Sequence, residues 1–183
     1  MAFRIEDIRA NLRLGGARPT LFQVELTSPF DADLNQIAPF LVQSTQIPAS
    51  DIGVIPVPYF GRKINVAGDR TFEPWTIQVM NDEDFRIRHA LERWHNAINS
   101  LSGNLNQTGS SSPANYKTQG LVKQYGKANE TVPIRVYRFY GMFPSSISTI
   151  DLDWNATDTI EQFSVTFAYD WYEVIGGTTG VVA

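Results

Sequence analysis

The sequence predicts a mainly antiparallel β domain with a single long helix at residues 82–101. Several segments alternate apolar and polar side chains with the period of two that a half-buried strand shows. Only one long segment repeats apolar residues at helical spacing, and no alternation of strands with helices indicates a parallel sheet. The 183 residues suit one domain, residues 1–183, with a single core and about seven strands.

The composition argues against several classes of function. Hydrophobic residues make up 43% and charged residues only 19%, below the roughly 25% charged residues of an average globular protein. This balance favours extra apolar surface, buried in a core or in an assembly. The chain has no cysteine, so it has no disulfides and no thiolate metal site. A net charge of −4 argues against binding nucleic acid through its phosphates, and we expect no signal peptide or membrane span.

The N-terminal part predicts one helix and two strands. Residues 3–14 fit a short amphipathic helix whose arginines favour partner docking or solvent, with a membrane-surface helix as the alternative. Residues 20–28 alternate as a strand, and the chain turns at residues 29–33. Residues 39–48 form a second strand bounded by prolines. We expect the two strands to form a hairpin.

Residues 50–68 predict an unusual loop. Five prolines and glycines interrupt the segment, yet it carries apolar side chains that cost roughly 25 cal/mol for each Å² left in water. We therefore expect something to cover this loop. The apolar residues concerned are Ile52, Val54, Ile55, Val57, Tyr59 and Phe60.

A strand and the helix follow directly. Trp75, Ile77 and Val79 share one face of a strand at residues 71–81. Asn81 or Asp82 is the expected N-cap of the helix at residues 82–101, and Gly103 is expected to stop it. Its buried stripe is predicted at Ile87, Leu91, Trp94, Ile98 and Leu101, with Ala90 and Ala97 beside it.

The C-terminal half predicts further strands. Residues 102–113 are rich in Gly, Ser and Asn, which indicates a flexible loop. Strands are predicted at residues 116–127 and 132–144, and the glycine-rich tail at residues 174–183 is expected to be loose. A strand beginning near residue 162 gives the cleanest alternation, with a core face at Phe163, Val165, Phe167, Tyr169 and Trp171.

No constellation of residues indicates a catalytic, metal or cofactor site. His89 and His95 lie six apart on one helix, about 240° around its axis, so they cannot share a metal ion. Residues 151–162 begin like a calcium loop, but Ala156 and Gln162 stand where Gly and Glu are required. The two aspartates at its start are interpreted as an exposed strand face rather than as paired catalytic carboxylates.

Three stretches carry a family resemblance. Residues 61–94, GRKINVAGDRTFEPWTIQVMNDEDFRIRHALERW, resemble the central signature of the tail tube proteins of T4-like contractile-tailed bacteriophages. Residues 17–26 resemble the family's first strand, and residues 151–173 resemble its closing hairpin. The resemblance implies a ring-forming antiparallel β-sandwich or barrel-like domain with one flanking helix. Tube proteins of type VI secretion and related injection systems share this fold.

The resemblance also implies how the protein assembles. Six copies would close into a ring and rings would stack into a tube, inside a tail sheath that faces the helix. The lumen would hold a tape measure protein and then double-stranded DNA, without sequence-specific binding. Baseplate or initiator proteins and tail terminator proteins would bind the ends. No cofactor, enzymatic activity or membrane is implied, and the protein would be assembled in the host cytoplasm and reside in the virion.

The same resemblance assigns two surfaces. The loop at residues 50–68 would reach the adjacent ring, with stacking residues Ile52, Val54, Ile55, Val57, Tyr59, Phe60 and Arg62. Six chains would carry six times −4, or −24, and a bore lined with carboxylates and neutral polar groups would repel the phosphate backbone. The candidate lumen residues are Asp151, Asp153, Gln162, Ser164, Thr166 and Asp170.

Two other interpretations stay open. A tube of the same fold would serve equally in a protein-delivering contractile injection system, and neighbouring capsid and portal genes would separate that function from a phage tail. Alternatively, the chain is a monomeric β-sandwich binding module or an enzyme whose groove uses the exposed aromatic residues. Such a protein would stay monomeric at high concentration.

Overall fold

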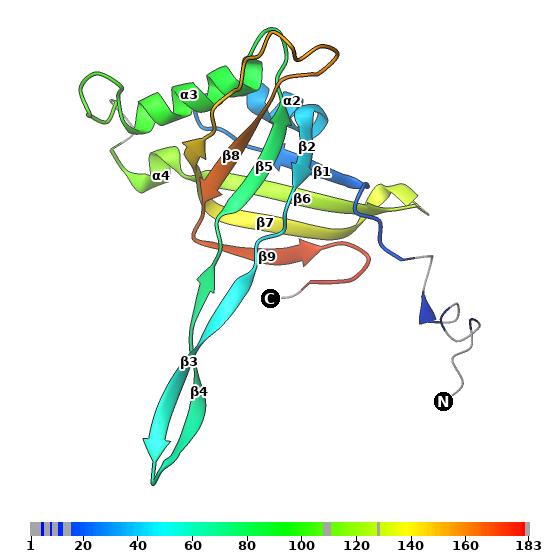
Figure 1. The fold of residues 1–183 in the computed structure, drawn as a ribbon, viewed down its shortest axis with the longest axis vertical. Helices are drawn as coiled ribbons and strands as arrows, with labels where there is room; N and C mark the ends of the chain where they lie inside the picture. The colour runs from blue at the N-terminus through cyan, green and yellow to red at the C-terminus, as the bar shows by residue number, and fades with distance from the viewer. Residues whose placement is uncertain are drawn as a thin grey trace.

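The computed structural model describes residues 5, 8, 11, 12, 16–107, 111–127 and 129–181. In this part of the chain the fold is mainly antiparallel β, as predicted, with three helices (Figure 1). The helix expected at residues 3–14 lies largely outside the described residues. The elements are β1 (Phe22–Leu26), α2 (Asp33–Leu41), β2 (Val42–Thr45), β3 (Ser50–Tyr59), β4 (Arg62–Phe72), β5 (Trp75–Met80), α3 (Arg86–Ile98), α4 (Pro113–Tyr116), β6 (Thr118–Gly126), β7 (Asn129–Ile147), β8 (Gln162–Ala168) and β9 (Trp171–Gly176).

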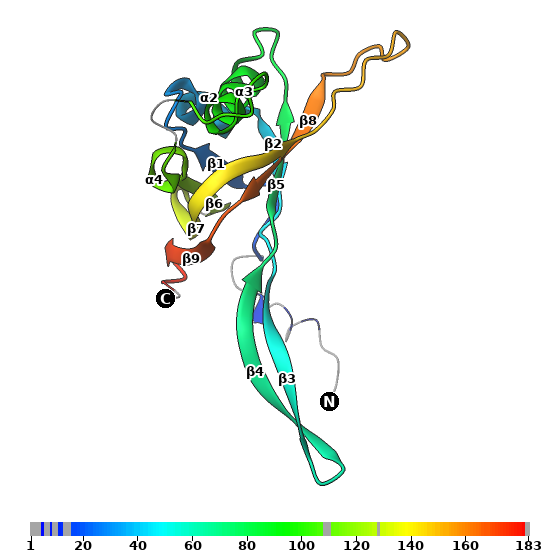
Figure 2. The same ribbon diagram turned by 90° about the vertical axis from the view of Figure 1, so that its left-hand side faces the viewer.

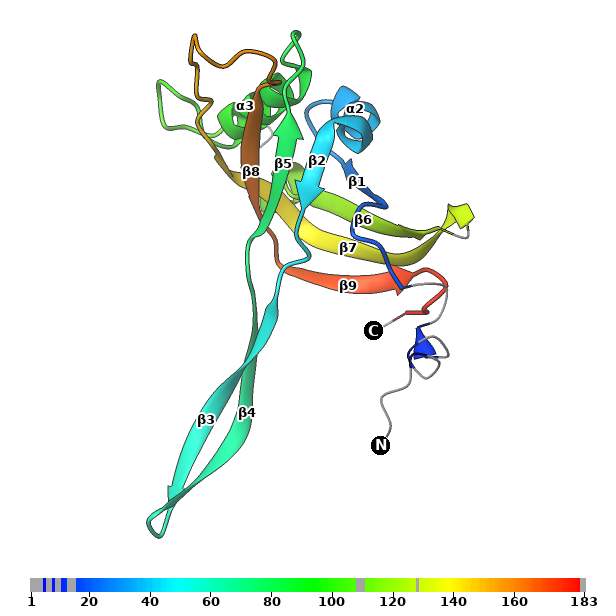
Figure 3. The same ribbon diagram turned by 45° about the vertical axis from the view of Figure 1, so that its right-hand side comes forward.

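The long strand β7 joins two half-sheets. The strand order is β1-β6-β7-β8-β5-β2, and β9 also pairs with β7. The first half-sheet contains β1, β6, β9 and the first part of β7, while the second contains β2, β5, β8 and residues 143–147 of β7. The strands of the two half-sheets cross steeply (Figures 1 and 3). Their inner faces therefore enclose one core, as in an orthogonal sandwich.

The centre of the core is aromatic. Trp75 stacks on Phe139 with ring centroids 4.4 Å apart, and Trp75 Nε1 donates a hydrogen bond to Thr45 Oγ1 at 2.8 Å. The alternation predicted for β5 is confirmed, because Trp75, Ile77 and Val79 are all buried. The alternation predicted for β8 is confirmed as well, with Phe163, Val165 and Phe167 buried.

Helix α3 is the predicted flanking helix, and it lies beside α2 (Figure 2). The helix starts at Arg86 with Phe85 as its N-cap, so the expected caps Asn81 and Asp82 are wrong. The Asp82 carboxylate still contacts the first helical residue, because Arg86 N donates to Asp82 Oδ1 at 3.0 Å and Arg86 Nε donates to Oδ2 at 2.6 Å. Desolvation is the largest single influence and would raise the pKa of Asp82, but the bonds and charge of Arg86 together lower it. The residue just before the helix, Phe85, takes a left-handed conformation with φ of 53°.

The end of α3 differs from the prediction. The helix stops at Ile98, its C-cap Asn99 is extended, and Gly103 lies beyond it in a turn. Leu101 is 97% exposed, so its placement in the buried stripe is wrong. The fully buried part of the stripe is confirmed at Ile87, Ala90, Leu91, Trp94 and Ala97.

Helix α2 replaces part of the predicted N-terminal hairpin. Leu34 and Ala38 are buried on one helical face, and Ile37 and Leu41 pack beside the same core. Packing of this face outweighs the cost of Pro39 inside the helix, which is about 3 kcal/mol for an interior proline. Strand β1 pairs with β6 and β2 pairs with β5, so the expected hairpin between them is wrong.

The predicted closing strand is two strands in different half-sheets. The chain turns at Tyr169 and Asp170 between β8 and β9, and β9 pairs with β7. Trp171 is 50% exposed and is not a core residue. Residues 148–161 form an irregular loop instead of a strand, so residues 151–173 are not a hairpin.

Two segments expected to be loose make specific contacts. Residues 174–176 belong to β9, and Thr178 N and Thr179 N donate to the carbonyl oxygens of Pro133 and Ile134 at 3.2 Å. In the polar segment after α3, Ser100 N donates to the carbonyl of Leu105 at 2.9 Å. Flexibility of residues 102–113 stays a prediction.

Packing around Gly120 gives a test of the sandwich. A Cβ at Gly120 would lie 2.9 Å from Met142 Sδ and 3.0 Å from a ring carbon of Trp75. Overpacking of this kind costs about 1–3 kcal/mol, so we expect Gly120→Ala to lower the urea midpoint of unfolding. Gly176→Ala is the matched control, since a Cβ there meets nothing within 4 Å. Equal midpoints for the two variants would contradict the packing described.

Candidate assembly surfaces

Strands β3 and β4 form an arm that leaves the body of the protein (Figures 1 and 2). Among the described strands they pair only with each other, in a two-stranded antiparallel sheet. The segment expected as an irregular loop is therefore a β-hairpin, and every residue of β3 is exposed. Phe60 and Gly61 make its two-residue turn with φ of 41° and 79°. Positive φ at both central residues is the requirement of a type I′ turn, whose twist matches that of the two strands.

The register divides the arm into two faces. The cross-strand pairs Ile55–Val66, Val57–Ile64 and Tyr59–Arg62 lie on one face, because side chains alternate along each strand. We call Ile55, Val57, Tyr59, Ile64 and Val66 the apolar arm face, and each is between 44% and 63% exposed. Among the predicted stacking residues, Val54 pairs with Ala67 on the opposite face, and Ile52 precedes a β-bulge. Ile64 and Val66 are absent from the predicted stacking residues, because only the pairing register assigns them to this face.

The tip of the arm is unfavourable in an isolated subunit. Phe60 is 91% exposed and has positive φ, a conformation that costs a bulky residue about 1–3 kcal/mol. Within the described part of the chain, the one aromatic ring that contacts Phe60 is that of Tyr59, in an edge-to-face arrangement with centroids 4.7 Å apart. An isolated two-stranded hairpin is also marginally stable in water. A contact that covers the arm would remove these costs.

Aromatic residues hold the root of the arm. Tyr172 OH donates to the carbonyl of Pro48 at 3.2 Å, and Tyr169 OH donates to the carbonyl of Glu73 at 2.7 Å. The Phe72 ring contacts both tyrosine rings, with centroid distances of 6.0 Å to Tyr169 and 5.4 Å to Tyr172. Burial, with smaller contributions from Tyr172 and Glu73, raises the pKa of Tyr169 above its usual value. The two strands that enter the arm are thus fixed to β9 and to the bend before it.

A polar strip covers the outer face of the second half-sheet. Thr76 pairs with Thr166 and Gln78 with Ser164, and the two threonine hydroxyls are 3.1 Å apart. Ser44 of β2 continues the strip beside Gln78. These residues are uncharged and lie opposite the buried face of the same strands. We refer to Ser44, Thr76, Gln78, Ser164 and Thr166 as the polar strip.

The structure separates the residues predicted to line a lumen. Gln162, Ser164 and Thr166 share the polar face of β8. Asp151 and Asp153 lie apart from them in the loop of residues 148–161. Asp170 lies at the bend after β8 and forms an ion pair with Lys117 at 2.7 Å.

The second half-sheet has two outer edges. One is β2, which pairs only with β5, and the other is residues 144–147 of β7, which pair only with β8 in the described chain. All the pairs between them are antiparallel. Three reversals separate β2 from β7, so these two edges run in opposite directions.

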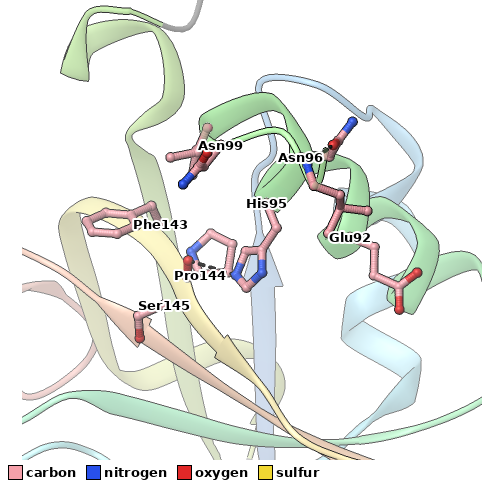
Figure 4. A pocket seen from close by; sticks show the side chains of 9 residues that line it. Glu92, His95, Asn96, Asn99, Phe143, Pro144 and Ser145 are labelled. Carbon is pink, nitrogen blue, oxygen red and sulfur yellow. Dashed lines mark hydrogen bonds between the residues drawn. The ribbon is translucent and has the colours of Figure 1, made fainter. Parts of the chain in front are cut away.

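A hollow of about 660 Å³ lies between the C-terminal half of α3 and β7. Figure 4 shows His95 pointing across it toward Pro144, whose carbonyl oxygen lies 3.0 Å from His95 Nε2. Phe143 and Ile98 give the hollow an apolar wall. It adjoins the outer edge of β7, so it belongs to the same flank as that edge.

Metal-binding geometry is absent from the described part of the chain, where no three His, Cys, Asp or Glu side chains gather. At the start of the calcium-like segment, Asp153 Oδ1 accepts hydrogen bonds from the backbone N and the side-chain Nδ2 of Asn155 at 2.9 and 3.0 Å. Within the described residues, no helix is long and apolar enough to cross a membrane.

Comparison with known proteins gives a consistent result. Residues 17–175 match the family described as phage tail tube protein. The chain is 36% identical over 170 residues to the tail tube protein gp19 of Enterobacteria phage T4, covering 92% of this chain and 99% of gp19. The chain belongs to the phage tail tube protein family. As a tail tube protein it is a structural component of the virion.

Solved structures share the fold of this tail tube protein. The cap of the anti-feeding prophage, AFP, has a TM-score of 0.63 at 17% identity, covering 86% of this chain and 89% of the cap chain. The sheath/tube terminator of PVC, an extracellular contractile injection system, has a TM-score of 0.61 at 16% identity, covering 85% of this chain and 94% of that chain.

The raised pKa of Tyr169 gives the tail tube protein a testable pH dependence. In the unfolded chain a tyrosine ionises near pH 10, while burial keeps Tyr169 protonated at that pH in the folded protein. Its contribution to stability is therefore complete below about pH 10 and is lost as pH rises toward the folded pKa. We expect the urea midpoint of the wild type to fall more between pH 8 and pH 10.5 than that of Tyr169→Phe. An identical fall in both proteins would contradict the burial of this hydroxyl.

Proposed function

We propose that this tail tube protein closes into six-membered rings that stack into the inner tube of a contractile phage tail. The observation that carries the proposal is the apolar arm face, which the subunit leaves uncovered at one end of the molecule. A contact between different patches on identical subunits closes into a ring when rotation brings it back, and continues as a filament when it does not. The arm supplies the filament contact, and the two edges of the second half-sheet supply the ring contact.

Ring closure through these edges is supported by strand direction. Rotation about a ring axis keeps each strand's direction along that axis, so β2 of one subunit would meet β7 of its neighbour in antiparallel order. The sheet would then continue around the ring without a change of pairing type. Closure also covers unpaired strand edges that would otherwise favour aggregation. The hollow beside β7 would lie against the neighbouring subunit.

The polar strip is proposed to face the lumen, together with Gln162. Hydroxyl and amide groups keep the bore wet without attracting phosphates, and six subunits carry six times −4, or −24. Double-stranded DNA would therefore pass along the tube without adhering. This role is passive and needs no cofactor, and we assign the protein no enzymatic activity.

Several partners follow from the tube function. The sheath would lie outside, against the exposed side of α3, while the tape measure protein and then DNA would occupy the lumen. Baseplate or initiator proteins and a tail terminator would bind the two ends, in line with the cap and terminator named among the structural neighbours. Assembly would take place in the host cytoplasm.

A protein-delivering injection system is the second candidate function. The AFP and PVC structures share the fold, but at 16–17% identity they carry no information on cargo. The 36% identity to a phage T4 protein along almost the whole chain favours the phage tail.

Electron microscopy of the purified protein, with tail initiator complexes added, tests stacking. Rings and hollow tubes are expected for the wild type. Val57→Asp/Phe60→Asp should keep the circular dichroism spectrum and lose tubes, because it places charges on the tip and on the apolar arm face. The control Ser111→Asp/Ser112→Asp adds the same charge in an exposed turn before α4 and should still form tubes. A wild type that stays monomeric under all these conditions would refute the tube function.

Cysteine labelling tests the direction of the polar strip. The chain has no cysteine, so Gln78→Cys and His89→Cys each offer one thiol. Both positions are exposed in the subunit, and His89 lies on α3 away from the hollow beside β7. In assembled tubes without sheath, a bulky maleimide should label His89→Cys rapidly and Gln78→Cys at least tenfold more slowly, whereas dissociated subunits should label alike. Rapid labelling of Gln78→Cys in tubes would place the polar strip outside the lumen.

A further inference from the structure

The loop of residues 148–161 lies at the opposite end of the molecule from the arm tip. Figures 1, 2 and 3 agree on this placement: the arm extends to one end of the long axis, and the loop, drawn in orange, extends to the other. Its apolar side chains project into solvent. Trp154 is fully exposed, and Leu152 and Ile160 are 85% and 66% exposed. The molecule therefore presents uncovered apolar surface at both ends.

The two ends have opposite charge. The loop carries Asp151, Asp153, Asp158 and Glu161, and it has no lysine or arginine. The outer part of the arm, residues 54–67, carries Arg62 and Lys63 beside the turn, and it has no aspartate or glutamate. Ends of opposite charge favour head-to-tail contact between copies, and they disfavour contact between two arms or two loops.

Internal hydrogen bonds give the loop a defined shape. Asp153 holds a turn, because its side chain accepts from Asn155 N at 2.9 Å and its backbone carbonyl accepts from Ala156 N at 3.1 Å. The loop is also tied to the sheet at both ends. Ser148 N donates to the carbonyl of Ser164 and Asn81 N donates to that of Glu161, each at 2.8 Å. Trp154 thus projects from a structured turn.

We infer that the arm tip of one copy docks on residues 148–161 of a second copy in the adjacent ring. Arg62 and Lys63 would face Asp151 and Asp153, and Trp154 would cover part of the apolar arm face. This inference rests on the proposed stacking and names the surface that receives the arm. Translation along the long axis brings the arm of one copy to the loop of the next, and the contact repeats without closing, as a filament requires.

Zero-length cross-linking tests the contact directly. A carbodiimide joins a lysine amine to a carboxylate only when the two groups touch, and Lys63 and the loop carboxylates lie at opposite ends of one subunit (Figure 1). A peptide linking Lys63 to residues 151–161 must therefore join two copies. We expect this peptide from assembled tubes and not from dissociated subunits. Tubes in which Lys63 is linked only to carboxylates outside the loop would overturn the inference.

Charge exchange supplies an independent test in the full chain. Arg62→Glu/Lys63→Glu and Asp151→Lys/Asp153→Lys should each lower the yield of tubes at least tenfold, since each places like charges at the contact. The variant with all four changes should recover tubes, because the arm is then acidic and the loop basic, so the two surfaces again carry opposite charges.

The outcomes separate this inference from the tube function. If the arm variant loses tubes while the loop variant keeps them, the arm docks elsewhere and the stacking function stands. If both single-end variants fail and the fourfold variant fails too, while all keep the wild-type unfolding midpoint, the pairing of these groups is refuted. If the wild type itself forms no tubes, even with initiator complexes, both the tube function and this inference are refuted.

Discussion

The direction of the arm depends on a small set of contacts at its root. The arm has no core of its own, so nothing along β3 and β4 fixes how they leave the body. Trp75 holds β5 against β2 through Thr45, and Tyr169 and Tyr172 bind backbone carbonyls on the two entering strands. Because β9 and the bend before it are positioned by β7, the arm inherits its orientation from the strand that joins both half-sheets. A hinge here would swing the arm tip out of register with any partner.

Prolines on the arm influence what kind of contact it makes. Pro56 and Pro58 of β3 lack the N–H that a further strand would need, so that edge cannot be extended by strand addition. The apolar arm face, in contrast, makes contacts through side chains, which do not depend on backbone N–H groups. Contact through the face rather than through the edge reduces uncontrolled sheet growth, which exposed hairpins otherwise invite.

Much of the body was predictable from the sequence because its signals are local. Period-two alternation identified the buried faces of β5 and β8, and helical spacing identified the buried face of α3. The failures involve pairing between distant residues. The alternation from residue 162 onward predicted one strand, but the bend at Tyr169 and Asp170 divides it into β8 and β9. The prolines and glycines of residues 50–68 predicted an irregular loop, although the segment forms a regular hairpin.

The candidate surfaces show the same limit. Exposure of apolar residues in the arm follows from composition, but the register decides that Val54 lies on one face and Ile64 on the other. The residues predicted to line the lumen lie in three places: on β8, in the loop of residues 148–161 and at the bend after β8. Alternation along a strand correctly places Ser164 and Thr166 on one face, but it does not apply to Asp153, which lies in the loop. A side-chain period predicts a shared face only where the strand is continuous.

The size of the arm bears on how rings add to a tube. A partly exposed aliphatic or aromatic side chain gains about 1 kcal/mol when a partner covers it, and association costs at least about 4 kcal/mol in lost freedom. The apolar arm face has five such residues, each already partly screened, so one arm contact alone holds two subunits weakly. If six arms of a ring engage together, the loss of translational and rotational freedom occurs once for the whole ring, while the six arm contacts each contribute. A ring therefore binds much more tightly than a single subunit, although each arm makes the same contact. Free subunits would then stay soluble, and stacking would proceed ring by ring from a nucleus that presents a complete circle of binding surfaces.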